Sequence, residues 1–203
     1  WHINEGHAAF MVLELIREQM AAGLDFAGAR EAAAAQCVFT THTPVAAGHD
    51  VFSHELALTH FEPFLAELKV DADTLLALGR TPGGKQPGFN MTRLALNGSR
   101  HCNGVSRIHG AVSKRIVADQ WPDIPPEENP VGYVTNGVHV STFLDQSWAE
   151  FFDVALGEHW RDRMTDPDFW RGLEQVADPV YWSKRQEIKA EMLSRLRERL
   201  RRE

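Results

Sequence analysis

The amino-acid sequence predicts an α/β fold with a parallel sheet. Three short apolar runs indicate buried strands, and segments with helical periodicity separate them. The runs occupy residues 37–40, 101–105 and 131–134. Strands separated by helices pair in parallel through right-handed connections, which gives a doubly wound sheet. Because three strands are few for a complete sheet, we expect this chain to form part of a larger α/β domain.

Two helices are expected before the first strand. Asn4 is a suitable N-cap for a helix that extends to about Met20, with an apolar stripe along one face and Gly23 as its stop. An alanine-rich helix follows at about residues 26–36. The first strand then begins directly after this second helix.

Further helices are expected between and after the strands. Their apolar residues recur at helical spacing, and stretches rich in glycine or proline separate them. These helices cover about residues 53–68, 72–78, 90–96 and 107–117, and most of the chain from residue 144 on. Residues 81–88 and 121–130 are expected to be loops, because glycine or proline is abundant in both.

Length, composition and charge are those of an ordinary globular domain. The chain has 203 residues, 43% of them hydrophobic and 24% charged, which is enough for one hydrophobic core. Its formal net charge of −7 argues against a nucleic-acid partner. No apolar run approaches the roughly 20 residues that span a bilayer, so we expect no membrane partner. Because the chain begins at Trp1 rather than Met, we interpret it as an internal segment.

The two cysteines indicate a reducing compartment. Cys37 and Cys102 fall in expected strands and do not form a spaced framework. This placement favours buried, reduced thiols over a disulfide. We therefore expect a cytoplasmic protein.

The C-terminal segment is basic. Residues 184–203 carry eight Lys or Arg residues against four Glu. We interpret this segment as a solvated helix whose apolar residues pack on a neighbour, and a polyanion-binding site is the weaker alternative. The apolar residues are Ile188, Met192, Leu196 and Leu200.

A glycine-rich stretch has the spacing of a phosphate-binding P-loop but not its context. Gly79 is followed at the required distance by Gly84 and Lys85, yet Gln86 stands where Ser or Thr contacts magnesium. The preceding residues 74–78 indicate a helix, whereas a P-loop follows a strand. We therefore expect an ordinary loop here.

Ten histidines raise the question of a metal site. His54 and His60 lie six residues apart in an expected helix, whereas two ligands on one helical face need a spacing of four. No cysteine pair or tight carboxylate cluster accompanies them in the sequence. We therefore expect no metal site, and a His-rich metal-dependent hydrolase is the weakest alternative function.

Polar turns follow the three expected strands and hold the first candidates for function, since ligands of open α/β sheets bind at the carboxyl ends of the strands. His42 follows the first strand between two threonines, and Pro44 prevents a helix from starting there. A neutral imidazole and the Asn136 amide each offer a donor and an acceptor, as a sugar hydroxyl requires. A core histidine with internal partners is the structural alternative for His42, and a tight Asn-Gly turn is the alternative for Asn136 and Asn103.

Five segments resemble, in the same order, the α-glucan phosphorylases. The match covers nearly the whole chain and is closer to the shorter bacterial maltodextrin and glycogen phosphorylase type than to the animal enzymes. The segments are residues 1–7 (WHINEGH), 39–45 (FTTHTPV) with 48–50 (GHD), 89–94 (FNMTRL), 103–110 (NGVSRIHG) and 135–139 (TNGVH).

The resemblance implies the fold and the reaction of that family. Its members have two Rossmann-like domains that face each other across a cleft, the GT-B arrangement of glycosyltransferases. They cut α-1,4 bonds of glycogen, starch or maltodextrin with inorganic phosphate and release glucose 1-phosphate with retention of configuration. Their pyridoxal 5′-phosphate forms a Schiff base with a lysine, and its phosphate group performs the acid–base step. The implied partners are therefore an α-1,4-glucan and inorganic phosphate.

The resemblance also assigns roles to single residues. His42 matches the catalytic histidine that binds the glucose 6-hydroxyl and directs its backbone carbonyl toward the oxocarbenium-like transition state. Asn136 matches the asparagine on the same hydroxyl, and Val105 matches the valine beneath the sugar. Glu5 and His7 match polar residues on the substrate side of the cleft, where the family commonly has Asp in place of Glu.

The cofactor lysine of the family has no match in this chain. None of the five lysines lies in the glycine-rich context that carries it, and the resemblance places that lysine in a second domain. Phe143 stands where the animal-type enzymes have a tryptophan beside the cofactor. We expect residues 1–178 to be the later part of the N-terminal glucan-binding domain and residues 179–203 to be a long connecting helix.

The sequence thus predicts a segment of an α-1,4-glucan phosphorylase that supplies the glucosyl-binding side of the active-site cleft. The parent protein is expected to be a glycosyltransferase, and the isolated segment is expected to be inactive. A non-catalytic carbohydrate-binding fragment is the main alternative. The oligomeric state stays open, with a homodimer of the full-length enzyme as one alternative.

Overall fold

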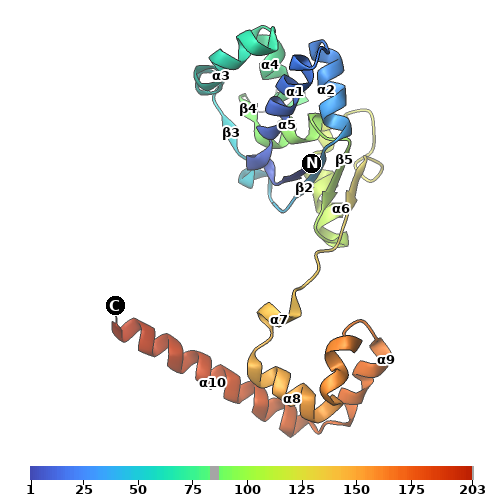
Figure 1. The fold of residues 1–203 in the computed structure, drawn as a ribbon, viewed down its shortest axis with the longest axis vertical. Helices are drawn as coiled ribbons and strands as arrows, with labels where there is room; N and C mark the ends of the chain where they lie inside the picture. Colours follow the sequence, from blue (N-terminus) through green and yellow to red (C-terminus); the bar gives the residue numbers. More distant parts are fainter. Residues whose placement is uncertain (83–86, 203) are drawn as a thin grey trace. The chain divides into compact units, whose positions relative to one another are not determined.

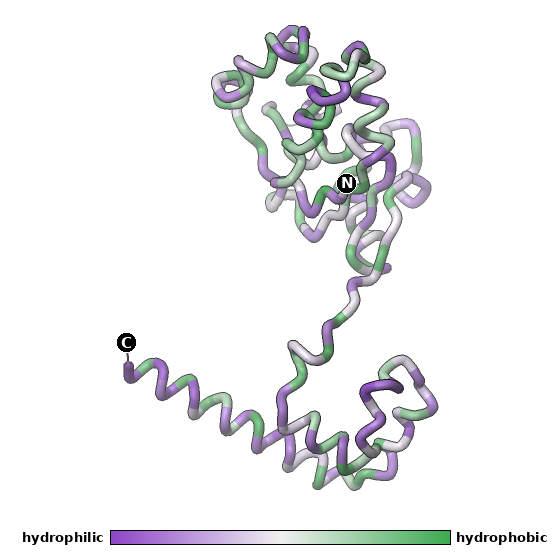
Figure 2. Tube along the Cα trace, in the orientation of Figure 1, coloured by the Kyte–Doolittle hydropathy of each residue, from purple (hydrophilic) through white to green (hydrophobic). Residues whose placement is uncertain are grey.

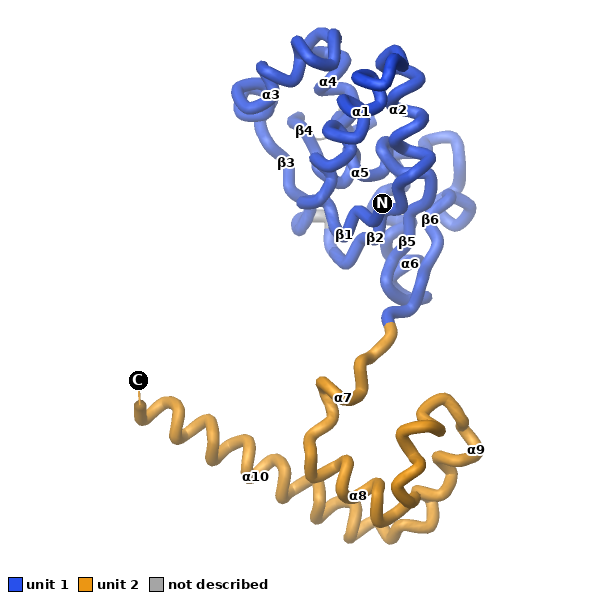
Figure 3. The backbone as a smooth tube through the Cα atoms, viewed as in Figure 1, with its two compact units in different colours: residues 1–136 blue, residues 137–203 orange. Residues whose placement is uncertain are grey.

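The computed structural model describes residues 1–82 and 87–202, which divide into two compact units (Figures 1 and 3). Unit 1 comprises Trp1–Asn136, and unit 2 begins at Gly137. Within each unit the residues contact one another more than they contact the other unit. The domain boundary expected between residues 178 and 179 stays a prediction.

Unit 1 is built on a parallel sheet of four short strands. The strands lie side by side in chain order and are β1 (His2–Asn4), β2 (Val38–Thr41), β5 (His101–Gly104) and β6 (Val131–Tyr133). The register pairs Asn4 with Thr40, Thr41 with Gly104, and Gly104 with Tyr133. All four strands therefore end at the same edge of the sheet. This arrangement confirms the expected α/β class and the parallel pairing.

The first strand corrects the expectation that Asn4 caps a helix. Asn4 instead ends β1, and a 3-10 turn, η1 (Gly6–Ala8), separates it from α1 (Met11–Ala21). A strand of three residues, of which only Ile3 is buried, is too short to show a recognisable alternation. Glu5 turns the chain after β1 with φ 72° and ψ 165°, a strained conformation for a residue that has a Cβ atom.

The other expected helices of unit 1 are present, with ends close to the predicted ones. They are α2 (Phe26–Ala35), α3 (His54–Leu68), α4 (Ala72–Leu78), α5 (Met91–Asn97) and α6 (Arg107–Ile116). Each begins after a residue whose side chain accepts a hydrogen bond from a backbone N–H of the first turn. These N-caps are Asp25, Ser53, Asp71, Asn90 and Ser106.

The hydrophobic core of unit 1 lies where the sheet meets its helices. Ile3 and Phe39 on β1 and β2 are fully buried, together with Ile16 of α1 and Leu94 of α5. Figure 1 shows α1 and α2 side by side, and α6 packs against β5 and β6. Burial of these side chains supplies the main driving force for folding unit 1.

A small antiparallel ribbon was not predicted from the sequence. It pairs β3 (Val51–Phe52) with β4 (Phe89–Asn90), and its strands of two residues are too short to produce a periodic signal. The rings of Phe52 and Phe89 join Phe10 and Phe61 in an aromatic cluster with centroid separations of 5.1 to 6.5 Å. The ribbon thus anchors the chain on both sides of α3 and α4 to the core.

The residues before the glycine-rich stretch and the histidine pair of the metal question lie on helices, as expected. Residues 74–78, which precede the glycine-rich stretch, belong to α4, so the strand that a P-loop requires is not there. Gly83, Gly84, Lys85 and Gln86 of that stretch lie outside the described residues. His54 and His60 both lie on α3.

Both cysteines are free thiols. Cys37 is buried directly before β2, and Cys102 is partly buried within β5. Burial raises the pKa of both thiols, that of Cys102 to about 12. The thiolate is the reactive form, so burial makes both residues poor nucleophiles in the folded protein.

We expect iodoacetamide at about pH 8 to alkylate Cys102 far more slowly in the folded chain than in urea, because the thiolate fraction is small in the fold. Mass spectrometry after a time course would measure both rates. Equal rates in the folded and the unfolded chain would contradict the burial of this thiol.

Unit 2 is helical and has an aromatic core. Its helices are α7 (Val140–Phe143), α8 (Gln146–Leu156), α9 (Pro167–Trp170) and α10 (Asp178–Arg202). The ring of Trp148 on α8 lies 5.0 Å from that of Tyr181 on α10, and the ring of Phe152 lies 5.5 Å from the buried Trp160. These ring contacts hold α8, α10 and the segment between them together.

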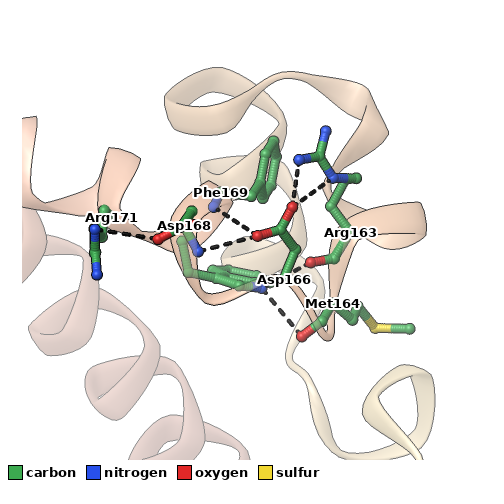
Figure 4. A network of polar contacts seen from close by, with 7 residues as sticks. Arg163, Met164, Asp166, Asp168, Phe169 and Arg171 are labelled. Atoms are coloured by element: carbon green, nitrogen blue, oxygen red, sulfur yellow. Dashed lines mark hydrogen bonds and ion pairs between the residues drawn. The ribbon is translucent and has the colours of Figure 1, made fainter.

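Asp166 fixes the turn that leads into α9 (Figure 4). One carboxylate oxygen accepts the backbone N–H groups of Asp168 and Phe169 at 3.0 and 3.2 Å. The other accepts the Nε–H of Arg163 at 3.0 Å, and the indole N–H of Trp170 donates to the Arg163 carbonyl oxygen at 3.1 Å. This cap and ion pair explain why the helix starts at Pro167.

The expected basic helix is present as α10. Its residues Met192, Leu196 and Leu200 are exposed, and Figure 2 shows hydrophobic and hydrophilic positions alternating along the helix. Packing of this stripe on a neighbour stays a prediction. Within residues 1–82 and 87–202, no helix combines the length and the hydropathy needed to cross a membrane.

Candidate functional site

The turns after β2, β5 and β6 are joined at the carboxyl edge of the sheet. The backbone N–H of Asn136 donates to the carbonyl oxygen of Val105 at 3.1 Å. The His109 ring lies between the turns after β5 and β2, 3.1 Å from the Val105 nitrogen and 3.1 Å from the Thr43 carbonyl oxygen. His42, Val105 and Asn136 thus follow strands that end at one edge of the sheet, and the convergence of their side chains stays a prediction. A concavity shared by the three residues stays a prediction.

His42 presents its ring at this edge. The residue is exposed, and its Nε2 lies 2.7 Å from the amide oxygen Oδ1 of Asn4 at the end of β1. An amide oxygen only accepts hydrogen bonds, so Nε2 carries the proton in this contact. In the neutral ring, Nδ1 is then left as an acceptor for a hydroxyl. The exposure of the ring argues against the alternative of a core histidine.

Glu5 holds the turn that carries His42. Its two carboxylate oxygens accept hydrogen bonds from the backbone N–H groups of Gly6 (3.1 Å) and His42 (2.6 Å) and from the hydroxyls of Thr41 (3.4 Å) and Thr43 (3.0 Å). A carboxylate offers about four acceptor positions, so protein donors fill those of Glu5. Burial opposes ionisation, but the hydrogen bonds from His42, Gly6 and Thr43 outweigh it and lower the pKa of Glu5.

Replacing Glu5 with Gln is expected to lower the free energy of unfolding by about 1–3 kcal/mol, because an NH₂ group would face donors that need an acceptor. The lowered pKa means that the carboxylate contributes stability above the ordinary Glu value of 4.5 and loses it as the pH falls below that value. The variant should lack this acid-dependent component.

Urea unfolding at neutral and acidic pH would measure both effects. Glu31→Gln is the matched control, because the side chain of Glu31 is 75% exposed. Unfolding curves for Glu5→Gln that match the control at both pH values would rule out this role of the carboxylate.

The remaining predicted site residues lie at the same edge. Val105 is half-buried, Asn136 is exposed, and His7 is exposed on η1 directly after β1. Tyr133 and Val134, which precede Asn136, are 53% and 63% exposed. An edge that exposes such large apolar side chains is typical of a surface that another part of a protein or a ligand covers.

Asn103 has a structural role that its sequence context left open. It lies within β5, where its Oδ1 accepts the hydroxyl of Thr40 at 3.2 Å and its Nδ2 donates to the Gly104 carbonyl oxygen at 3.2 Å. Thr40 also lies 2.8 Å from Nε2 of His2. These bonds connect three neighbouring strands, so Asn103 supports the sheet and does not form a tight turn.

Two histidines near the site were missed by the sequence analysis. His109 links two of the turns, and His49 places Nδ1 2.5 Å from the Thr92 hydroxyl of α5. Burial lowers the pKa of His49, which favours its neutral form. Both lie inside the segments 48–50 and 103–110 that carry the family resemblance. The contacts of His49 with Thr92 and of His109 with Thr43 join residues 43 and 66 positions apart, so spacing alone could not reveal them.

The described residues offer no cluster of metal ligands. Across residues 1–82 and 87–202, no group of three or more His, Cys, Asp or Glu residues could hold a metal ion. Lys114 donates to the carbonyl oxygens of Glu127 and Asn129 at 2.8 and 3.0 Å, and Lys69 ends α3 with φ 52°. The Lys114 ammonium group is therefore held by the segment that precedes β6.

Comparison with known proteins connects this geometry with one family. The chain matches the family model described as carbohydrate phosphorylase over residues 1–203. It is 36% identical to a maltodextrin phosphorylase of Thermococcus litoralis over 199 residues, which cover 98% of the chain and 23% of that protein. It is 35% identical to a glycogen phosphorylase of Mycobacterium tuberculosis over 208 residues, which cover 99% of the chain and 24% of that protein.

The animal relatives are more distant. The muscle glycogen phosphorylase of Oryctolagus cuniculus is 24% identical over 195 residues, which cover 87% of the chain and 22% of that protein. The chain thus spans about a quarter of the length of the curated relatives it matches. The difference in identity agrees with the expected likeness to the microbial enzymes.

Proposed function

The chain belongs to the carbohydrate phosphorylase family, and we propose that it is the glucosyl-binding segment of an α-1,4-glucan phosphorylase. In this proposal the complete protein is a cytoplasmic glycosyltransferase of the GT-B arrangement. It transfers a terminal glucosyl group of glycogen, starch or maltodextrin to inorganic phosphate. The carboxyl edge of the sheet in unit 1 faces the cleft.

The observation that carries the proposal is the meeting of His42, Val105 and Asn136 at one sheet edge. His42 keeps Nδ1 as an acceptor while Asn4 holds Nε2, so the ring suits a sugar hydroxyl. The Asn136 amide adds a donor and an acceptor, and Val105 offers an apolar surface to the sugar ring. These groups follow different strands, so the sheet itself sets their spacing.

Pyridoxal 5′-phosphate would supply an acid–base phosphate group to the complete enzyme. The resemblance to the phosphorylases places the attachment lysine in a second domain, and Lys114 of this chain is hydrogen-bonded to the carbonyl oxygens of Glu127 and Asn129. In the proposal this chain therefore binds and orients the sugar, and another part of the protein holds the cofactor. Glu5 keeps the His42 turn in place for that task.

The test is an assay of the complete protein with maltodextrin and inorganic phosphate. Release of glucose 1-phosphate that depends on both substrates is the expected result. Binding of maltodextrin without any such release would favour the alternative of a carbohydrate-binding protein and would overturn the proposal.

A further inference from the structure

We propose that His109 is a positioning residue that ties the turn carrying His42 to the turn carrying Val105. It lies in the first turn of α6 and is 9% exposed. Its Nδ1 accepts the backbone N–H of Val105 at 3.1 Å, and its Nε2 lies 3.1 Å from the carbonyl oxygen of Thr43. This inference rests on the proposed function, because it assigns His109 to the same sugar site.

The two contacts determine which nitrogen of the His109 ring carries the proton. A carbonyl oxygen only accepts, so Nε2 must donate to Thr43. A backbone N–H only donates, so Nδ1 must offer its lone pair to Val105. The ring is therefore neutral with its proton on Nε2, and each nitrogen satisfies a backbone group of a different turn. Both bonds would be lost in an apolar replacement.

The position of the ring is fixed by close packing around the start of α6. Ser106 caps the helix by accepting the N–H of His109 at 3.1 Å. A Cβ atom on Gly104 would lie 2.8 Å from Nδ1 of His109, and one on Gly110 would lie 2.9 Å from Cβ of Tyr133. Glycine at both positions lets the helix approach the ends of β5 and β6 this closely. The ring thus has little room to reorient.

The link extends to the third turn of the site. Val105, whose N–H binds His109, also accepts the N–H of Asn136 through its carbonyl oxygen. Thr43, on the other side of the ring, directly follows His42. One imidazole therefore binds the turns that carry His42 and Val105, and the Val105 carbonyl connects them to Asn136. A shift of these turns by about 1 Å is enough to lower turnover about a hundredfold.

Three replacements separate the two contacts of the ring. His109→Asn keeps an acceptor near the backbone of its own turn, within reach of Val105 but short of Thr43. His109→Gln carries its amide farther, toward Thr43. His109→Ala removes both contacts. His101→Gln is the matched control, because His101 is an exposed histidine at the opposite end of β5.

In the complete enzyme, His109→Ala is expected to lower kcat about a hundredfold while the KM for phosphate stays unchanged. The Asn and Gln variants should each restore part of the loss, and His101→Gln should match the wild type. In the 203-residue chain, the backbone N–H of Asn136 should exchange its hydrogen faster in His109→Ala than in the wild type, as measured by NMR. If the Ala variant does not fold, the Asn and Gln variants provide both measurements.

Wild-type kcat and unchanged exchange at Asn136 in a folded His109→Ala variant would overturn the proposal. If that variant does not fold, unchanged exchange at Asn136 in both the Asn and the Gln variants would overturn it. An equal loss of kcat in His101→Gln would overturn it as well. A complete wild-type protein without phosphorylase activity would overturn the proposed function instead. The exchange measurement on the 203-residue chain would still decide whether His109 links the turns.

Discussion

Replacing His42 with Ala in the complete enzyme is expected to lower kcat, because hydrogen bonds to the reacting sugar strengthen as charge develops in the transition state. The activation free energy should rise by about 2–4 kcal/mol. This energy corresponds to a loss of about thirtyfold to a thousandfold. The imidazole is exposed and keeps Nδ1 as an acceptor, so its removal takes away a sugar contact without opening a cavity in the core.

The reaction rate with maltodextrin and phosphate should be measured at saturating substrate, with thermal unfolding of the same samples recorded alongside. His60→Ala is the matched control, because His60 is an exposed histidine on α3. The control should keep the wild-type kcat. A His42→Ala variant with unchanged kcat would exclude His42 from the reacting centre.

The isolated 203-residue chain is expected to produce no glucose 1-phosphate, even with added pyridoxal 5′-phosphate. The resemblance to the phosphorylases places the cofactor lysine in a second domain, and Lys114 of this chain is bonded to the carbonyl oxygens of Glu127 and Asn129. In the proposal, the phosphate-binding group comes from another part of the complete protein. Binding one side of a sugar does not by itself lower the barrier to its transfer.

The assay would combine the pure chain with maltodextrin, phosphate and cofactor, and a heat-treated sample would serve as the blank. The complete enzyme at the same molar concentration is the positive control. Turnover by the isolated chain above the blank would show that the catalytic groups lie within these 203 residues.

Much of unit 1 could be predicted because its helices are long enough to show a periodic pattern. The apolar runs that contain β2, β5 and β6 lie between these helical segments and the loops that join them. The three-residue β6 lies in the apolar run 131–134, whereas β1, also of three residues, has a single buried residue, and β3 and β4 have two residues each. Local sequence carries too little information to specify such elements.

The site residues likewise include some that the local sequence could predict and some that it could not. His42 and Asn136 could be placed at one sheet edge because they directly follow strands that the sequence predicts. The hydrogen bonds of Glu5 could not be predicted, since they require β1 to pair beside β2. His109 sits in a helix and binds residues 4 and 66 positions away, so no local pattern marks it.

The chain order of the sheet also bears on how the site is assembled during synthesis. In the four-stranded sheet, each strand from β2 on pairs with an earlier strand of that sheet, so its partner has already been synthesised when it leaves the ribosome. The acceptor for the Asn136 amide, the Val105 carbonyl, is likewise made earlier in the chain. The strand β6 and the turn that carries Asn136 are therefore the last parts of the proposed sugar site to be synthesised.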